Sequence, residues 1–351
     1  MSTVKILMTG GGAPGAAGII KCLKQQQGFS VMAADANSDA IGKYLADEFV
    51  TIPSATDPQF LEAILKICKQ QKPDILLPLV TKELIWLAEN KKEIESTGTK
   101  VLVSDAASLE IANNKSKLYE FLQWRGITVP SFHIVETVDQ FISALASLGY
   151  PQKTVCFKPS IANGSRGFRI ISPQIDEIDL LFNHKPNATY ISYADAVRIL
   201  SSAAFPQLLV SEYLPGEEYS VDCLAHHGKA ILVLPRIRKK IVNGITTEGR
   251  FEQNESIISY CTQIIKEINL HGNIGIQVKK DTNGNYMILE INPRVQGTIA
   301  AALGAGVNLP LLALKQELGM PIPDLEMQVN WNTGFSRHWT EVFYKESDSK
   351  A

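Results

Sequence analysis

The sequence predicts an α/β unit built on a parallel sheet, followed by an α+β unit built on antiparallel strands. Residues 1 to about 112 alternate short β-rich runs with helical patterns, which is typical of a parallel sheet covered by helices. From Ser131 onward the strands are longer and follow hairpin-like turns. With 351 residues, of which 45% are hydrophobic, the chain has enough apolar material for two or three packed units.

The first unit is expected to be Rossmann-like. Its strands are the β-rich runs Val4–Thr9, Ser30–Ala34, Val50–Pro53, Asp74–Leu79 and Val101–Val103. Its helices are the amphipathic segments Ala16–Gln26, Pro58–Gln71 and Lys82–Glu95. Because strands and helices alternate, the strands should run parallel, with helices on both faces of the sheet.

The second unit begins with a helix over Asn114–Arg125, which Asn113 or Asn114 can cap and which Gly126 ends. The strands expected after it are Thr154–Lys158, Phe168–Ile171, Gln207–Tyr213, Tyr219–Ala225, Ala230–Arg236, Gly275–Asp281 and Tyr286–Ile291. The helices expected to cover them are Glu255–Ile268, Gly297–Leu303 and Pro310–Leu318. Asn283-Gly284 between the last two strands is a strong hairpin signal.

Charge and cysteine content restrict the partners and the compartment. A net charge of -2 gives no basic field that would attract nucleic acid or an anionic membrane, so we expect a small-molecule substrate. Five scattered cysteines without a CxxC pair fit reduced thiols and a cytoplasmic protein. No export signal or membrane span is visible, and the six histidines show no partner at the level of motifs.

A glycine-rich turn follows the first strand and has two interpretations. Gly10, Gly12 and Gly15 satisfy the GxGxxG pattern, and Asp35 lies at the end of the next strand, as in a dinucleotide site. The same glycines also serve wherever a strand turns tightly into a closely packed helix. Taken alone, the turn leaves an NAD site and a structural turn equally open.

The first of three further motifs joins a cation to a glycine loop. Lys158 ends a strand, and Asn163-Gly164-Ser165-Arg166-Gly167 follows it. Backbone N–H groups of such a loop can approach phosphate oxygens, and the lysine can neutralise their charge. An ordinary turn beside a surface lysine is the alternative for this motif alone.

The second motif is a hinge between two strands. An apolar strand ends at Glu212, bends at Pro215-Gly216 and continues as a second strand. An extended hinge can offer a backbone C=O and N–H to a purine, and a nearby carboxylate can hold ribose hydroxyls. The alternative is an ordinary Pro-Gly turn with exposed acidic residues.

The third motif is a polar stripe on the late hairpin. Strand alternation puts Glu290, Asn292 and Arg294 on one face, and antiparallel pairing can bring Gln277 beside them. Carboxylate and amide oxygens suit Mg²⁺, which is usually shared with substrate phosphates, and the arginine would meet a phosphoryl group. The presence of all three motifs in this order favours a nucleotide and metal site.

In this order the motifs resemble those of the ATP-grasp superfamily, and the chain is similar to one ATP-grasp half of the large chain of carbamoyl-phosphate synthase. The resemblance covers about residues 1–320, and LEINPRVQGT, FKPSIANGSRGF and VSEYLPGEEYSVD carry it. It implies a pre-ATP-grasp domain at 1–112 that does not bind NAD, an ATP-grasp domain at 113–320 and a C-terminal segment at 321–351. The ATP-grasp domain would comprise two α+β subdomains, one with the flap at about 130–213 and one that binds metal at about 214–320.

The resemblance also implies roles for individual residues. The residues that would bind the ATP phosphates are Lys115 and Lys158, with a mobile flap at Gly164, Ser165, Arg166 and Gly167. The hinge residues that would bind adenine are Glu212, Tyr213 and Leu214, and Glu218 would bind the ribose.

The same resemblance supplies a metal site and catalytic cations. The ligands of two Mg²⁺ ions, with Mn²⁺ as a substitute, would be Gln277, Glu290 and Asn292. Arg294 matches the arginine that stabilises the transferred phosphate, and Arg236 and Arg238 are candidates for holding the carboxylate substrate or phosphates.

The implied activity is that of an ADP-forming ligase that joins a small carboxylate to an amine or ammonia through an acyl phosphate. One ATP-grasp unit argues against carbamoyl-phosphate synthesis, and Val295-Gln296 after Arg294 replaces the Glu-His pair of biotin carboxylases, which puts bicarbonate chemistry in doubt. A homodimer is expected. An NAD-binding oxidoreductase and a non-catalytic ATP-binding module are the other functions open at this point.

Overall fold

The computed structural model describes the chain except for residues 1–2, 163, 165, 184–188, 243 and 346–351. The chain forms two compact units. The first unit contains residues 1–112, 219–277 and 291–351, and the second contains residues 113–218 and 278–290. The sequence-predicted boundary at residue 112 is also a boundary between these units, whereas the first unit takes in two later segments of the chain as well.

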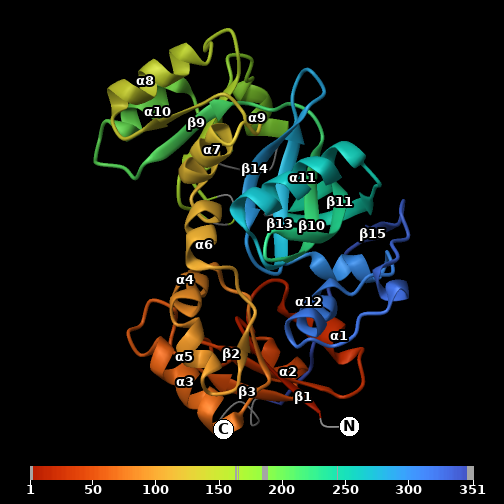
Figure 1. The fold of residues 1–351 in the computed structure, drawn as a ribbon. Coiled ribbons are helices and arrows are strands. Elements are labelled where there is room, and N and C mark those ends of the chain that lie inside the picture. Colours follow the sequence, from red (N-terminus) through yellow and green to blue (C-terminus); the bar gives the residue numbers. More distant parts are fainter. Residues whose placement is uncertain (1–2, 163, 165, 184–188, 243, 346–351) are drawn as a thin grey trace. The chain divides into compact units, whose positions relative to one another are not determined.

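A five-stranded sheet in the order β3-β2-β1-β4-β5 opens the first unit (Figure 1). Its strands are β1 (Val4–Thr9), β2 (Phe29–Asp35), β3 (Glu48–Thr51), β4 (Ile75–Pro78) and β5 (Lys100–Val101). Every pairing is parallel, which confirms the predicted Rossmann-like sheet. Its helices are α1 (Ala16–Lys24), α2 (Gly42–Leu45), α3 (Phe60–Gln71), α4 (Thr81–Glu89), α5 (Lys91–Glu95) and α6 (Ala106–Ala112).

Alternation along β1 explains why helices cover both faces of this sheet. Ile6 and Met8 are buried in one apolar cluster with residues of α1, whereas Leu7 between them is buried in another cluster with residues of α3. Successive side chains of a strand point to opposite faces, so a strand covered on both sides reads as a continuous apolar run.

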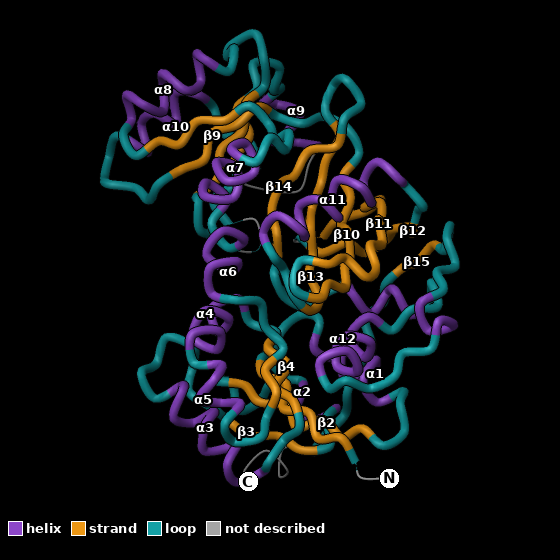
Figure 2. The backbone as a smooth tube through the Cα atoms, viewed as in Figure 1, coloured by secondary structure: helices purple, strands orange, loops and turns teal. Residues whose placement is uncertain are grey.

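A six-stranded sheet has the order β14-β13-β10-β11-β12-β15 (Figure 2). Its strands are β10 (Glu218–His226), β11 (Lys229–Val242), β12 (Ile245–Phe251), β13 (Gly272–Lys280), β14 (Tyr286–Asn292) and β15 (Gly334–Ser336). Neighbouring helical segments are α11 (Glu255–Ile268), α12 (Leu309–Glu317) and the 3₁₀ helices η1 (Ile299–Leu303) and η2 (Asp324–Met327). The pairings of β11 with β10 and β12 are antiparallel, as predicted for the α+β part.

Residues 113–218 of the second unit contain a four-stranded antiparallel sheet in the order β6-β9-β7-β8. Its strands are β6 (Phe132–Val135), β7 (Val155–Pro159), β8 (Arg169–Ile171) and β9 (Leu208–Glu212). Its helices are α7 (Lys115–Trp124), α8 (Val138–Ser147), α9 (Glu177–Asn183) and α10 (Tyr193–Leu200). Asn114 caps α7 by accepting hydrogen bonds from two backbone N–H groups of its first turn, which fixes where Lys115 begins the helix.

Three expected elements differ from the observed ones. The single helix expected over residues 82–95 is divided into α4 and α5 at Asn90, whose side-chain amide donates to the Trp86 carbonyl. The helix expected at Gly297–Leu303 is the 3₁₀ helix η1, and the strand expected at Ala230–Arg236 extends to Val242. Among the described residues, no helix is both long and apolar enough to cross a membrane.

Candidate active site

Lys115 lies at the start of α7, in the second unit, and is almost completely buried. Its backbone N–H donates to the Ser160 carbonyl at 2.8 Å, which ties the helix to the end of β7. Its Nζ donates to the Ala162 carbonyl at 2.6 Å and lies 3.4 Å from Oε2 of Glu290. The ammonium therefore stands between the start of the glycine loop and a carboxylate of β14.

Lys158, near the end of β7, is held by groups of the same unit. Its Nζ donates to the Leu289 carbonyl at 2.8 Å and lies 5.4 Å from the centre of the Tyr119 ring. Tyr119 is fixed in turn, because its hydroxyl donates to the Ile288 carbonyl at 2.7 Å. Burial lowers the pKa of Lys158 to about 8, although the charge of Glu290 opposes that shift. An arriving anion would favour the protonated amine.

The hinge is held by backbone contacts of the second unit. The Gly216 N–H donates to the Lys280 carbonyl at 3.0 Å, and the backbone N–H of Lys280 donates to the Glu217 carbonyl at 3.0 Å. A Cβ on Gly216 would lie 2.8 Å from the Lys280 carbonyl oxygen, so the close approach requires glycine. The hinge therefore keeps one fixed path beside β13.

The predicted adenine and ribose contacts lie along this hinge. The Glu212 carboxylate accepts a hydrogen bond from the Ser131 N–H at 2.7 Å, and Leu214 is buried. The Tyr213 ring lies 4.7 Å from Nζ of Lys279. Glu218 opens β10 and is half-buried.

The predicted flap is described only in part, since Ser165 lies outside the described residues. Gly164 and Gly167 have φ values of 64° and 77°, a region that favours glycine. Arg166 is exposed between them. The left-handed backbone at both glycines makes the loop a turn. Such a turn is compatible with both the phosphate-binding loop and the ordinary turn considered from the sequence.

The predicted metal ligands come from neighbouring strands of the six-stranded sheet. Glu290 and Asn292 are both half-buried and lie two residues apart on β14, so they share one face. Gln277 lies on β13, next to β14 in the sheet, and its Oε1 accepts a hydrogen bond from Arg238 at 3.3 Å. A carboxylate and two amide oxygens form a donor set that suits Mg²⁺.

Two of the predicted catalytic arginines are half-buried in the first unit. Arg294 donates from Nε to the Thr81 hydroxyl at 2.9 Å and from Nη1 to the Val295 carbonyl at 2.8 Å. Arg238 donates to Gln277, to the Thr246 hydroxyl at 3.0 Å and to the Gly244 carbonyl at 2.7 Å. Arg238 therefore orients a predicted metal ligand as well as offering positive charge.

Arg236 is placed differently from the expectation that it contacts substrate. Its side chain is 0% exposed and donates to Asp222 at 3.1 Å and to the Thr298 hydroxyl at 2.8 Å. The rings of Phe251 and Phe335 lie on it at 5.9 and 5.4 Å. Only its Nη1 has no hydrogen-bond partner among the described residues. Because no part of it is exposed, we assign it as a positioning residue of the core.

The glycine turn after β1 is explained by packing. A Cβ on Gly15 would lie 2.5 Å from the Cα of Gly297, so the close backbone contact excludes any side chain there. Asp35, the expected ribose partner of a dinucleotide site, accepts hydrogen bonds from the N–H groups of Gly12 at 2.7 Å and Asn37 at 2.8 Å. Both features favour a structural turn.

Motif analysis missed two groups beside the predicted residues. Tyr119 supports Lys158, and no sequence pattern marks a tyrosine in the middle of a helix. Glu83 is buried and accepts a hydrogen bond from the Thr9 hydroxyl, and burial raises the pKa of its carboxyl to about 7. In the sequence, Glu83 looks like one of the acidic residues that are common in the first turn of a helix.

Comparisons with known proteins show similarity in family segments and in fold. Residues 204–343 match the family described as ATP-grasp in the biosynthetic pathway with Ter operon, and residues 6–102 match the PylC-like N-terminal domain. An ADP complex of N5-carboxyaminoimidazole ribonucleotide synthetase superposes with a TM-score of 0.70 at 17% identity, covering 95% of this chain and 81% of that one.

Two further solved structures have the same fold. An L-amino acid ligase from Bacillus licheniformis gives a TM-score of 0.66 at 16% identity, covering 94% of this chain and 78% of that one. Biotin carboxylase from Campylobacter jejuni gives a TM-score of 0.65 at 17% identity, covering 93% of this chain and 73% of that one. The two family matches and these likenesses in fold agree with the resemblance to ATP-grasp proteins seen in the sequence.

Proposed function

We propose that the protein is an ATP-dependent ligase that joins a small carboxylate to an amine or ammonia through an acyl phosphate and releases ADP and phosphate. The observation that carries the proposal is the group of Lys115, Lys158 and Glu290 in the second unit. The buried Lys115 ammonium lies 3.4 Å from Glu290, and the half-buried Lys158 is influenced by the charge of the same carboxylate. Such a site suits the polyphosphate of ATP with its accompanying metal.

The names of the structural relatives support the choice of reaction class. An L-amino acid ligase and an N5-carboxyaminoimidazole ribonucleotide synthetase share the fold, and the second was solved with ADP. We infer that residues 113–320 act as the ATP-grasp domain behind a pre-ATP-grasp domain at 1–112. The five cysteines are all buried and free, which supports a reducing cytoplasmic location, and a homodimer is the assembly we expect.

In the proposed first step, a substrate carboxylate oxygen attacks the γ-phosphorus of ATP, and the bond to the β–γ bridging oxygen breaks. Lys115 and Lys158 would bind the phosphate oxygens and Arg294 the transferred group, so that positive charge is already in place where negative charge shifts. Arg238 would hold the substrate carboxylate. Two Mg²⁺ ions, or Mn²⁺, when bound by Gln277, Glu290 and Asn292, supply further positive charge to the phosphates.

In the proposed second step, the nitrogen of the amine attacks the acyl carbon, and the bond from that carbon to the phosphate oxygen breaks. Phosphate leaves, and the proton of the amine goes to phosphate or solvent. Water would hydrolyse the same intermediate, so the loop at Gly164–Gly167 would have to exclude it. No cysteine or serine nucleophile takes part in this scheme.

The experiment is trapping with hydroxylamine in a screen of carboxylates. With a true substrate, hydroxamate and ADP should accumulate in equal amounts, and Lys158→Met should form neither above background. Stoichiometric AMP and pyrophosphate would contradict the acyl-phosphate route. ATP binding without turnover across carboxylate and amine pools would instead favour the non-catalytic module.

A further inference from the structure

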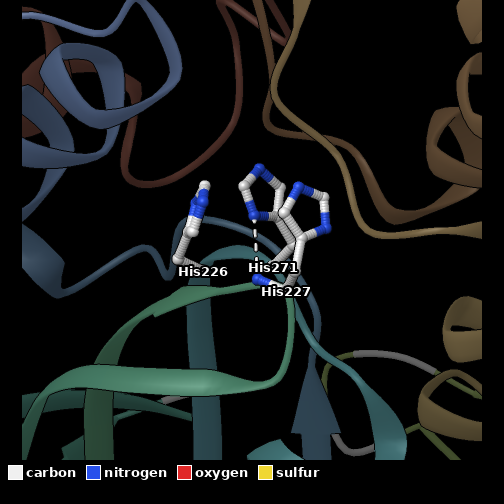
Figure 3. A group of neighbouring side chains, drawn as sticks. All are labelled: His226, His227 and His271. Carbon is white, nitrogen blue, oxygen red and sulfur yellow. Dashed lines mark hydrogen bonds between the residues drawn. The ribbon is translucent and has the colours of Figure 1, made fainter.

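Two groups of closely packed polar side chains lie outside the ligand contacts proposed above. In the first unit, His226, His227 and His271 come together at one end of the six-stranded sheet (Figure 3). Nδ1 of His271 accepts the backbone N–H of His227 at 3.3 Å, and its Nε2 lies 2.7 Å from the Glu317 carboxylate. Both ring nitrogens of His271 are therefore already bonded within the protein. The second group surrounds Ser160, in the second unit.

Ser160 directly follows β7, at the start of the glycine loop, and is almost completely buried. Its carbonyl accepts the backbone N–H of Lys115 at 2.8 Å, and its own N–H donates to the Gln207 carbonyl at 2.9 Å. Ser160 is thus bonded through its backbone to the first residue of α7 and to the residue before β9. Because Lys115 begins α7, these bonds fix the point from which the lysine side chain extends.

The Ser160 hydroxyl forms two further hydrogen bonds. Its Oγ lies 2.6 Å from Oγ of Ser116, the second residue of α7, and it donates to Oε1 of Gln207 at 3.0 Å. The amide nitrogen of Gln207 donates to Glu136 at 2.8 Å, which fixes the amide oxygen as the acceptor from Ser160. A hydroxyl has one proton to donate, so Ser160 must accept from Ser116. The hydrogen bonds therefore run in one direction, from Ser116 through Ser160 to Gln207.

The glycine loop is also held at its base and by the Lys115 ammonium. A Cβ on Gly167 would lie 2.6 Å from Cδ and Cγ of Pro159, so the end of the loop packs on the residue before Ser160. Nζ of Lys115 donates to the carbonyl of Ala162, two residues after Ser160, at 2.6 Å. The two groups proposed for phosphate binding, the ammonium and the loop, therefore both start from Ser160.

The contacts of the Lys115 ammonium leave little freedom for its position. An ammonium group has three N–H donors. One is used by the Ala162 carbonyl, and the Glu290 carboxylate lies 3.4 Å from the same Nζ. Keeping both contacts leaves a third N–H for a phosphate oxygen. A shift of the first turn of α7 against the start of the loop would break this set of contacts, so binding depends on how the two are joined.

We propose that Ser160 is a positioning residue for ATP. Through Ser116 and Gln207 it holds the first turn of α7 and the start of the glycine loop in the arrangement in which Lys115 and the loop meet the same phosphate. This role rests on the proposed function, because it concerns what keeps that site in place before the nucleotide arrives. The hydroxyl makes no contact with ATP in this arrangement, since it is buried and bonded to protein groups on both sides.

Titration calorimetry of the full chain with ATP and Mg²⁺ tests this role. Ser160→Ala loses two hydrogen bonds and should weaken ATP binding about tenfold, whereas Ser116→Ala loses one and should weaken it about threefold. In the Ser160→Ala chain, Ser116→Ala should not weaken binding further, because the bond between the hydroxyls is already absent. Wild-type affinity in Ser160→Ala, or effects of the two replacements that add in full, would overturn the proposal.

Adenosine separates a role at the phosphates from a general disturbance of the unit. It has no phosphate, so in competition with ATP it should bind the wild type and Ser160→Ala equally well. An equal loss of adenosine and ATP affinity in Ser160→Ala would contradict a role in placing Lys115 and the loop. A wild type that binds ATP but forms no hydroxamate would contradict the ligase function and leave this positioning role standing, because the binding measurements need no turnover.

Ser108→Ala is the matched control variant. It removes a buried hydroxyl of the first unit that donates to the Ile268 carbonyl at 2.7 Å. Both Ser108→Ala and Ser160→Ala should lower the thermal midpoint, because each loses a buried hydrogen bond. Only Ser160→Ala should weaken ATP binding. The same loss of ATP affinity in Ser108→Ala would trace the effect to lowered stability and overturn the proposal.

Discussion

The Lys115 ammonium and the Glu290 carboxylate lie 3.4 Å apart although 175 positions separate them in the chain. The first belongs to the start of a helix and the second to β14, and the second unit contains both. The Glu290 carboxylate can hold the Lys115 ammonium in position when no ligand is bound. The pair therefore connects the predicted phosphate and metal functions.

Replacement of Glu290 by alanine tests that connection. We expect Mg²⁺-dependent ATP turnover to fall by roughly a hundredfold or more, because a metal ligand and the partner of Lys115 are both lost. The measurement is ADP release over a range of Mg²⁺ concentrations, with Glu120→Ala, an exposed acid on α7, as the matched control. Full turnover in a folded Glu290→Ala protein would remove Glu290 from the site.

Lys158 should make ATP binding depend on pH. Because its pKa is lowered from 10.5 to about 8, it is charged below pH 8 and loses its proton above, where binding must first restore that charge. Affinity should be constant below pH 8 and fall up to about tenfold per pH unit above it. Titration calorimetry from pH 7 to 9.5 measures this. Lys158→Gln should bind ATP more weakly and should lose the fall in affinity above pH 8. The same fall in that variant would contradict Lys158 as the titrating group.

Glu83 should make stability depend on pH in the opposite sense to an ordinary paired acid. Burial raises its pKa from 4.5 to about 7, so the folded protein binds the proton more tightly than the unfolded chain does. Its contribution is then most favourable below pH 4.5, declines as the pH rises to 7 and is constant above.

Replacement of Glu83 by glutamine keeps a partner for Thr9 without the charge. At pH 8 we expect it to raise the free energy of unfolding by up to roughly 3 kcal/mol, with little change at pH 4.5. Denaturant unfolding at the two pH values measures this, and Glu62→Gln on the surface of α3 is the control. A loss of stability at pH 8 would show that the ionised form is the favoured one.

Arg236 and Arg238 are two residues apart on β11, yet we expect them to respond differently to replacement. Arg236→Met leaves Asp222 buried without its cation and should lower the free energy of unfolding by about 3–5 kcal/mol. Adding Asp222→Leu to the same chain should restore a large part of that loss, because it removes the unpaired carboxylate. Arg238→Met loses hydrogen bonds worth about 0.5–1.5 kcal/mol each, and in addition it should raise KM for the carboxylate roughly 10–100-fold. Unfolding curves and steady-state kinetics of both variants check this, and a KM effect confined to Arg236→Met would reverse the two roles.

The sequence predicted the elements whose causes are local. The parallel sheet follows from buried β-rich runs, the start of α7 from Asn114, and the β13–β14 hairpin from Asn283-Gly284. The second half of β11 was missed, because its exposed residues, such as Lys239 and Lys240, look like a loop in the sequence. The strand exists there because β12 pairs with it, which no local pattern shows.

The site divides in the same way. Lys158 and Glu290 lie in recognisable motifs, whereas the role of Tyr119 depends on a contact with a distant segment. Its hydroxyl donates to the Ile288 carbonyl, 169 positions later in the chain. The burial of Arg236 could not be foreseen either, since strand alternation gives it the same face as Arg238, and only Asp222, Phe251 and Phe335 make it a core residue.

The glycine turn after β1 allows a direct decision between nucleotides. In a dinucleotide site its glycines would make room for a pyrophosphate and Asp35 would hold a ribose. Here the Gly297 backbone fills the space beside Gly15, with its Cα 2.5 Å from where a Cβ would lie, and Asp35 is bonded to the turn itself. We therefore expect calorimetry to detect ATP and ADP binding and no binding of NAD⁺ or NADH. Gly15→Ala should cost about 1–3 kcal/mol of stability through crowding alone, and saturable NADH binding that this variant abolishes would instead establish the turn as a dinucleotide site.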